Sequence, residues 1–432
     1  MAPLTTSAGR LAGEAVAWLR RAVRLRSGDS PTQLQAATAL TVICAIAMSI
    51  GGWYSIDRRE RAIDDVAAAA GQLIRVQDVR VLMVQADSIA SSAYLEAGLE
   101  SADQRQAYED RIAGATARLI EVADAAGGVD ESLLGSISAQ FATYVGLVEQ
   151  ARANNRQGFP VGAAYQRQAR GELEQMVASL RTIEQSARTR VNDSVEDAHR
   201  AGWLLVVTTV LLLVVLALGS LWLAQRWHRM VNVPIAIAGL LAILVLTAGA
   251  GANHRAISRT DDTVSSSLAV ADLLAQARAA GFDARSNEAL TLIARGNGQA
   301  YQTQWRVANS IASFALDRAC NDFRQGCEAA SDNELYGISH ELLRQLDDEG
   351  SWDEAVVAVI DTDTDPLQLN ARFEAFARSA ERDLASSTAS AVDGFDDATS
   401  SLGTLRILVV LAGLIAAVLA IAGYGQRLRE YR

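Results

Sequence analysis

Lysine is absent from this chain: all 39 basic side chains among its 432 residues are arginine. The absence excludes the lysine of a P-loop, a Schiff-base lysine and the ATP-anchoring lysine of protein kinases. The sequence also has no nucleophile elbow, no HExxH helix and no glycine-rich phosphate loop. We therefore expect a protein that is not an enzyme and that carries no cofactor.

Residues that bind metals are scarce. The four histidines are His199, His228, His254 and His340, and they do not cluster in sequence or follow the spacing of a zinc site. Asp361, Asp363 and Asp365 alternate as in part of a calcium loop, but no Gly or Glu follows at the required positions. We predict no metal site.

Only three cysteines occur. Cys44 lies inside an apolar run, where it acts as a small apolar side chain. On one unbroken helix Cys320 and Cys327 would lie about 10 Å apart, beyond the roughly 7 Å that a disulfide spans. A turn at Gly326 would fold the chain back and bring them together. We predict a disulfide there, with a reduced pair as the alternative.

Four apolar runs are each long enough to cross a membrane of about 30 Å. They are expected at 34–53, 202–224, 231–251 and 404–424, and the only charge that we find in them is Arg406, near a membrane edge. Basic residues concentrate in 1–33, 225–230 and 425–432, which therefore belong in the cytoplasm. The sequence predicts a multi-pass protein of the cell membrane with both termini cytoplasmic.

Two long regions, 54–201 and 252–403, are then expected outside the cytoplasm. The first has 16 Arg against 22 acidic residues, and the second has 12 Arg against 25. Acidic surfaces of this kind argue against nucleic acid as a partner. Most of these acids are expected to keep long helices soluble.

Both long regions are dense in Ala, Leu, Glu, Gln and Arg, with apolar residues at helical spacing and few prolines. Breaks are expected at 97–103, 126–130 and 154–162 in the first region, and at 295–298, 324–332 and 347–366 in the second. A short extra helix is predicted at 352–360. The first and last helices of each region should run without interruption into their membrane spans.

The order of segments repeats: span, about 150 outer residues, span, then the same again. The tripeptide Gln-Ala-Tyr occurs at 106–108 and again at 299–301, which is weak sequence similarity between the two halves. The predicted fold class is an all-α membrane protein with four transmembrane helices and two duplicated extracytoplasmic antiparallel four-helix bundles.

The segment 154–165 is the least generic part of the chain. A plain turn requires its Gly and Pro residues but not an Arg and a Phe at an exposed tip. A partner-binding tip is one hypothesis for this segment and a structural turn is the other. The candidate partner-binding residues are Asn154, Asn155, Arg156, Phe159 and Tyr165.

The four spans, the two outer helical regions and the 154–165 segment resemble the actinobacterial GlnX-type membrane proteins. The resemblance implies two partners, an external amino-acid-binding lipoprotein of the GlnH type and a cytoplasmic Ser/Thr kinase of the PknG type. It implies a transmembrane signalling adaptor that senses the binding protein and relays its state to the kinase. The sequence leaves open whether the chain forms a homodimer.

The three predicted cytoplasmic segments are too short to fold a catalytic domain. Any signal must therefore pass to another protein, and the candidate relay residues are Arg226, Arg229, Arg427 and Arg429. Contact with anionic lipid headgroups is the alternative role for these arginines. A chemoreceptor-like sensor that binds a small molecule directly is the alternative function. A transporter is disfavoured because the spans lack interior charges and broken helices.

Overall fold

The computed structural model describes residues 30–96, 100–124, 129–227, 232–360 and 367–429. All secondary structure in these ranges is helical, and four helical stretches are long and apolar enough to cross a membrane. The chain is an all-α membrane protein. It divides into two compact units, a span-bearing unit (1–57, 202–252 and 402–432) and a two-bundle unit (58–201 and 253–401).

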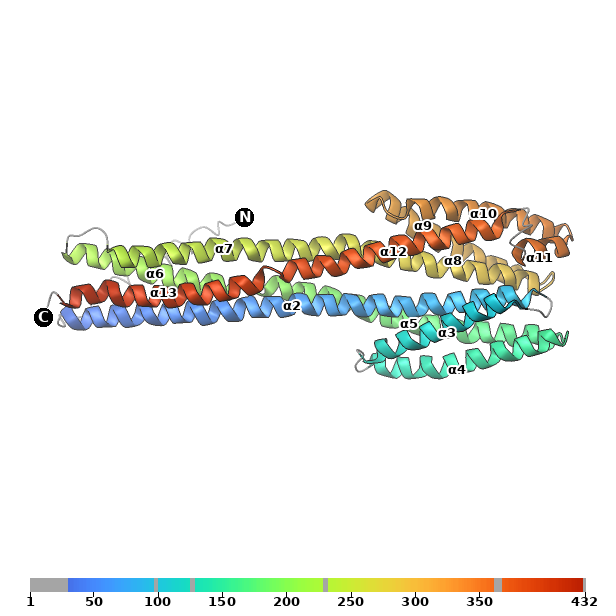
Figure 1. Ribbon diagram of the computed structural model, residues 1–432, viewed down its shortest axis with the longest axis horizontal. Coiled ribbons are helices and arrows are strands. Elements are labelled where there is room, and N and C mark those ends of the chain that lie inside the picture. The colour runs from blue at the N-terminus through green and yellow to red at the C-terminus, as the bar shows by residue number, and fades with distance from the viewer. Residues whose placement is uncertain (1–29, 97–99, 125–128, 228–231, 361–366, 430–432) are drawn as a thin grey trace, which may run out of the picture. The chain divides into compact units, whose positions relative to one another are not determined.

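Four long helices enter the span-bearing unit (Figure 1). They are α2 (Ser30–Tyr94), α6 (Trp203–Trp227), α7 (Val233–Thr263) and α13 (Leu402–Arg429). Small residues let these helices pack closely. A Cβ atom on Gly413 would lie only 2.9 Å from the carbonyl oxygen of Ala45, which is too close, so glycine permits this approach. Arg406, predicted at a membrane edge, pairs with Asp57 at 3.2 Å.

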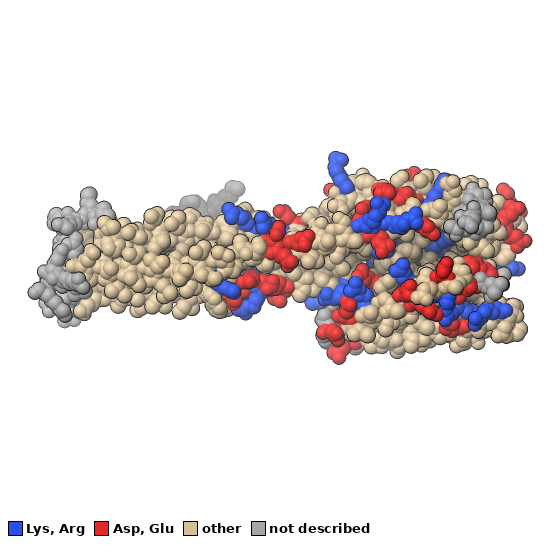
Figure 2. Space-filling view, in the orientation of Figure 1, with Lys and Arg blue, Asp and Glu red and all other residues tan. Residues whose placement is uncertain are grey.

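The visible surface of the span-bearing unit carries almost no charged side chains (Figure 2). Large apolar residues are exposed on its helices, among them Ile50, Leu211, Leu244 and Val418. On the two-bundle unit, in contrast, Arg and acidic side chains are interleaved. An apolar outer surface is the one that a lipid environment requires of a helical protein.

The two-bundle unit contains two sets of helices. Bundle 1 consists of α2 from residue 58 onward, α3 (Ala102–Asp124), α4 (Val129–Arg156) and α5 (Val161–Arg200). Bundle 2 consists of the π-helical turn η1 (Val264–Leu268), α8 (Ala269–Ile293), α9 (Gln299–Phe323), α10 (Cys327–Asp348), α11 (Trp352–Ile360) and α12 (Leu369–Thr399). The short extra helix α11 has the bounds that the sequence predicts.

The two bundles share apolar contacts. Ala279 of α8 belongs to the core of bundle 1, and Leu95, just beyond α2, belongs to the core of bundle 2. A third cluster joins α2, α5, η1 and α12 through residues that include Val66, Val191 and Phe395. The two bundles therefore bury apolar side chains against each other and form one unit.

Two of the expected uninterrupted helices are broken, and that part of the prediction is wrong. Helix α5 ends at Arg200, and α6 starts only after Gly202, whose φ of +100° lies outside the helical region. Helix α12 ends at Thr399, where Thr399 and Ser400 donate to backbone carbonyl groups of the preceding turn. Helix α2 is continuous, and α7 continues through η1 into α8.

The turn between α9 and α10 is shorter than the break predicted at 324–332, because α10 begins at Cys327. Arg324 and Gly326 both have left-handed backbone, with φ of 57° and 73°. This reversal brings the Cα atoms of Cys320 and Cys327 to 4.7 Å, and the two residues form a disulfide. The bridge joins the end of α9 to the first residue of α10.

Replacing Cys320 and Cys327 by serine is expected to lower the stability of the two-bundle unit. Closing a loop of this small size removes enough entropy from the unfolded chain to stabilise the fold by about 2–3 kcal/mol. Thermal unfolding followed by circular dichroism in detergent measures the loss. Cys44→Ser is the control, because Cys44 is free. An unchanged melting temperature in the double variant would contradict the prediction.

Candidate functional site

Helices α2 and α8 lie side by side where the two bundles meet. Gln77 donates to Asp272 and Ser91 lies 3.3 Å from Ser286, and each pair is separated by 195 residues. Ser286 also donates to Asp87, 199 residues away. A nearly constant separation along two helices means that they run parallel. The first long helix of each bundle therefore forms the contact between them.

A buried carboxylate lies in this contact. Asp87 of α2 is 0% exposed and accepts hydrogen bonds from Tyr144 of α4 at 3.3 Å and from Arg170 of α5 at 3.0 Å. Ser286 of α8 donates to it as well. Three donors from three helices therefore surround a carboxylate that water does not reach, as the burial of a polar group requires.

Arg170 connects the bundles. Besides Asp87, its guanidinium donates to Asp283 of α8 and to Glu174 of α5, the latter at 3.3 Å. Burial lowers its pKa, but Asp283 and Asp87 outweigh burial and raise the pKa well above its ordinary value. The group is therefore charged at any physiological pH and holds α2, α5 and α8 together.

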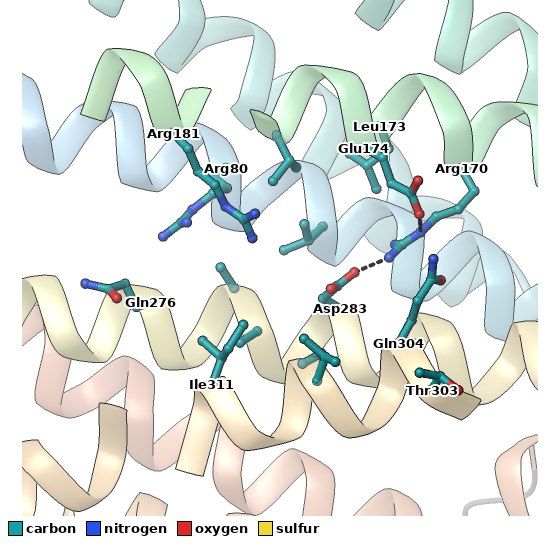
Figure 3. Close-up of a pocket in the computed structure, with 16 residues that line it drawn as sticks. Arg80, Arg170, Leu173, Glu174, Arg181, Gln276, Asp283, Thr303, Gln304 and Ile311 are labelled. Atoms are coloured by element: carbon teal, nitrogen blue, oxygen red, sulfur yellow. Dashed lines mark hydrogen bonds and ion pairs between the residues drawn. The ribbon is translucent and has the colours of Figure 1, made fainter. Parts of the chain in front are cut away.

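Beside this network is a groove of about 490 Å³ between α2, α5, α8 and α9 (Figure 3). Its volume lies within the range of small-molecule sites. The polar lining residues are Arg80, Arg170, Glu174, Arg181, Gln276, Asp283, Thr303 and Gln304. The apolar lining residues are Val84, Leu173, Val177, Ala279, Ala280, Val307, Ala308 and Ile311.

Arg80 lies at the end of the groove away from the Arg170–Asp283 pair, beside Arg181 (Figure 3). It is 6% exposed, and its Nε atom lies 3.0 Å from Oε1 of Glu184. Burial lowers the pKa of Arg80 and raises that of Glu184, while each charge favours the ionised form of the other. Neither Nε nor Nη2 of Arg80 has a hydrogen-bonding partner among the described residues.

A second buried polar cluster lies in the core of bundle 2. Glu288 accepts hydrogen bonds from Arg285 and from the Tyr336 hydroxyl, and its Oε2 lies 2.7 Å from Nδ1 of His340. The His340 ring stacks on Trp305, with centroids 3.5 Å apart. Burial raises the pKa of Glu288, but Arg285 and His340 outweigh burial and lower it overall.

Three of the predicted tip residues have contacts within bundle 1. The side chain of Asn154 donates to the Gln150 carbonyl at 2.8 Å, and that of Asn155 donates to the Tyr94 carbonyl at 2.8 Å. Tyr165 is half-buried and packs against the core of bundle 1. These three side chains stabilise the turn between α4 and α5 and its contact with the end of α2.

The other two tip residues are exposed. Phe159 is 52% exposed, the neighbouring Val161 is 46% exposed, and Arg156 is exposed as well. Arg156 also lines a polar cavity of about 490 Å³ together with Glu100 and Arg105. An exposed apolar pair beside a basic side chain is available for contact with another protein.

The candidate relay residues have no described side chains. Arg226 lies in α6 and Arg427 and Arg429 in α13, whereas Arg229 falls outside the described residues. The aspartates at 361, 363 and 365 also lie outside them. Among the described residues, no group of three or more metal-binding side chains comes together.

The sequence predictions missed both buried clusters, although the pattern held a signal for each. Asp87 is four residues from the buried Met83, and Glu288 is four residues from the buried Ala284 and Leu292. An acidic residue within an apolar stripe at helical spacing is a candidate for a paired buried charge. His340 is also buried in bundle 2.

Residues 62–196 match the family model described as an actinobacterial sensor domain. The match supports an actinobacterial sensor protein. It covers bundle 1, from α2 to most of α5. No curated protein and no solved structure matches the chain.

Proposed function

We propose that this sensor protein is a transmembrane signalling adaptor rather than an enzyme. The observation that carries the proposal is a sensor-domain match on a helical bundle whose helix α2 also contains a candidate membrane span. In the proposal, both bundles lie outside the cytoplasm and an amino-acid-binding lipoprotein contacts them. A soluble cytoplasmic Ser/Thr kinase receives the signal, as the GlnX-type resemblance implies.

Helix continuity supports a relay through the membrane. Helix α2 runs for 65 residues from Ser30 to Tyr94, and α7, η1 and α8 form an unbroken helical stretch from Val233 to Ile293. A tilt or slide of such a helix at one end is transmitted to its other end, because helices are stiff compared with loops. The arginines at 226, 229, 427 and 429 would then change position against the kinase or the lipid headgroups.

Affinity capture of the full chain in mild detergent tests the adaptor. We expect an extracytoplasmic solute-binding lipoprotein and a soluble Ser/Thr kinase to co-purify, with recovery that changes when Glu, Asp or Gln is added. Mass spectrometry identifies the captured proteins. Capture of neither protein, with or without amino acids, would overturn the adaptor proposal.

Changes at the exposed tip provide a sharper test. Replacing Phe159 and Arg156 by aspartate removes the apolar and basic contacts, and we expect lipoprotein recovery to fall about tenfold or more, as for loss of an interface hot spot. Ile120→Asp is the matched control, because Ile120 is 59% exposed and lies elsewhere in bundle 1, on α3. Equal loss in the control and the tip variant would exclude a specific role for the tip.

The groove favours a second candidate function, a direct small-molecule sensor. It lies between helices of both bundles, and it contains a buried guanidinium nitrogen without a partner among the described residues. Direct sensing predicts that the purified chain binds a small molecule with no lipoprotein present. The adaptor alone predicts that no such binding occurs.

A further inference from the structure

We propose that the groove between α2, α5, α8 and α9 binds a small monocarboxylate with a short aliphatic body. The carboxylate group would lie against Arg80, and the aliphatic body along the alanines of α8. This inference rests on the direct-sensing function and names its ligand class. It requires neither the lipoprotein nor the kinase.

The first argument is the incomplete pairing of Arg80. Its Nε lies 3.0 Å from Oε1 of Glu184 without a hydrogen bond between them, and Nη2 is also buried with no hydrogen-bonding partner among the described residues. Leaving a buried donor unpaired costs free energy. Because Arg80 lines the groove, an oxygen acceptor on a ligand there would give its guanidinium a hydrogen-bonding partner.

The second argument is the local charge. Three guanidinium groups, Arg80, Arg181 and Arg188, gather at this end against two carboxylates, Glu184 and Asp272. Arg188 already donates to Asp272 at 2.5 Å. At this end one positive charge, that of the exposed Arg181, is in excess, and one negative charge on a ligand would balance it. At the other end Arg170 faces the carboxylates of Asp87, Asp283 and Glu174, so an anionic group is favoured at the Arg80 end alone.

The third argument is the shape and chemistry of the rest of the groove. Ala279 and Ala280 are buried small residues of α8, and Leu173 and Val177 of α5 also line the groove. Burial of methylene groups against such a surface stabilises a complex. At the other end Arg170 is already paired with Asp283, so this arginine does not compete for the carboxylate.

Binding in this groove would act on both bundles. Arg80 and Leu173 belong to bundle 1, whereas Ala279 and Ala280 belong to bundle 2. A ligand that contacts both would favour the arrangement of α2 and α8 to which it binds best, and would disfavour others. The groove therefore lies where a ligand can alter the relation between the two parallel helices.

Calorimetric titration of the full chain in lipid nanodiscs tests the proposal, with empty nanodiscs as the blank. The probes are acetate, butanoate and hexanoate, and the matched controls are hexylamine and hexanol. We expect the carboxylates to bind and the affinity to rise by about fourfold for each buried methylene group. Binding of hexylamine as tight as that of hexanoate, or no binding of any carboxylate, would overturn the proposal.

Variants identify the site. Replacing both Arg80 and Glu184 by glutamine removes the pair without leaving a lone buried charge, and it should weaken hexanoate binding by about 10- to 100-fold. Ala280→Leu keeps Arg80 and fills the groove, and it should also abolish binding. Arg378→Gln is the control, because Arg378 is an exposed residue of α12 that does not line this groove. Unchanged hexanoate affinity in both groove variants would place the ligand elsewhere and refute the site.

The same preparations separate the two functions. A chain that captures the lipoprotein and kinase but binds no carboxylate is an adaptor without this site. A chain that binds hexanoate through Arg80 but captures neither protein retains the site and loses the adaptor function.

Discussion

Replacement of Arg170 by methionine is expected to lower the free energy of unfolding of the two-bundle unit by about 3–5 kcal/mol. The reason is that Asp87, at 0% exposure, would lose its only charged hydrogen-bonding partner among the described residues. Asp283 would lose the same guanidinium. Chemical denaturation in detergent, followed by circular dichroism, measures the loss.

A double-mutant cycle separates the lost pair from lost packing. Asp87→Asn together with Arg170→Met should cost less than the sum of the two single changes, because the double variant buries no lone carboxylate. Arg378→Met is the matched control: its ion pair with Glu374, at 3.0 Å, is exposed and should contribute no more than about 1 kcal/mol. If Arg170→Met were no more destabilising than this control, the bridging role of Arg170 would be wrong.

The helices themselves follow from local rules, and for that reason the sequence predicts them well. Breaks were expected where Gly, Asn, Asp or Pro cluster. Helices α3, α4, α9 and α11 begin and end close to those positions, and α5 begins at one of them. The errors fall at Gly202, Thr399 and Ser400. At Gly202 a positive φ angle ends a helix whose composition alone favours continuation, and at the end of α12 two adjacent hydroxyl side chains bond to carbonyl groups of the preceding turn.

The contact between the bundles could not be predicted in this way. Its polar pairs join residues 195 or more positions apart, such as Ser91 and Ser286, and no local pattern specifies which distant residue is the partner. The groove arises from that contact, because α2 and α5 supply one side and α8 and α9 the other. From the sequence alone the tip of bundle 1 is therefore the candidate partner site, and no local pattern marks Arg80.

The tip residues also show that a local pattern does not specify tertiary contacts. Composition singled out the segment 154–165, and the structure divides its candidates into two kinds. Asn155 bonds to the end of α2, whereas Phe159 projects into solvent. Both residues were candidates for partner binding, but only three-dimensional contacts distinguish the residue that supports the turn from the residue that is free to bind a partner.

Replacement of Glu288 by alanine is expected to cause the other large loss of stability, again about 3–5 kcal/mol at neutral pH. Arg285 would keep only its bonds to the Val359 carbonyl and Asn370, while His340 and Tyr336, both 0% exposed, would each lose an acceptor. Glu288→Gln should cost less, since the amide oxygen still accepts hydrogen bonds. The same denaturation experiment measures both variants.

The dependence on pH distinguishes the charge of Glu288 from its packing. The pKa of Glu288 is lowered in the folded protein. Its charge therefore stabilises the fold at pH values above the unfolded pKa of about 4.3. This stabilisation is lost as the pH falls through the folded pKa. The stability gap between the native chain and Glu288→Gln should therefore be widest near neutral pH and should narrow below about pH 4.3. Glu374→Gln, at an exposed position, is the matched control. If the stability difference between the native chain and Glu288→Gln stayed constant from neutral to acidic pH, Glu288 would act through packing alone.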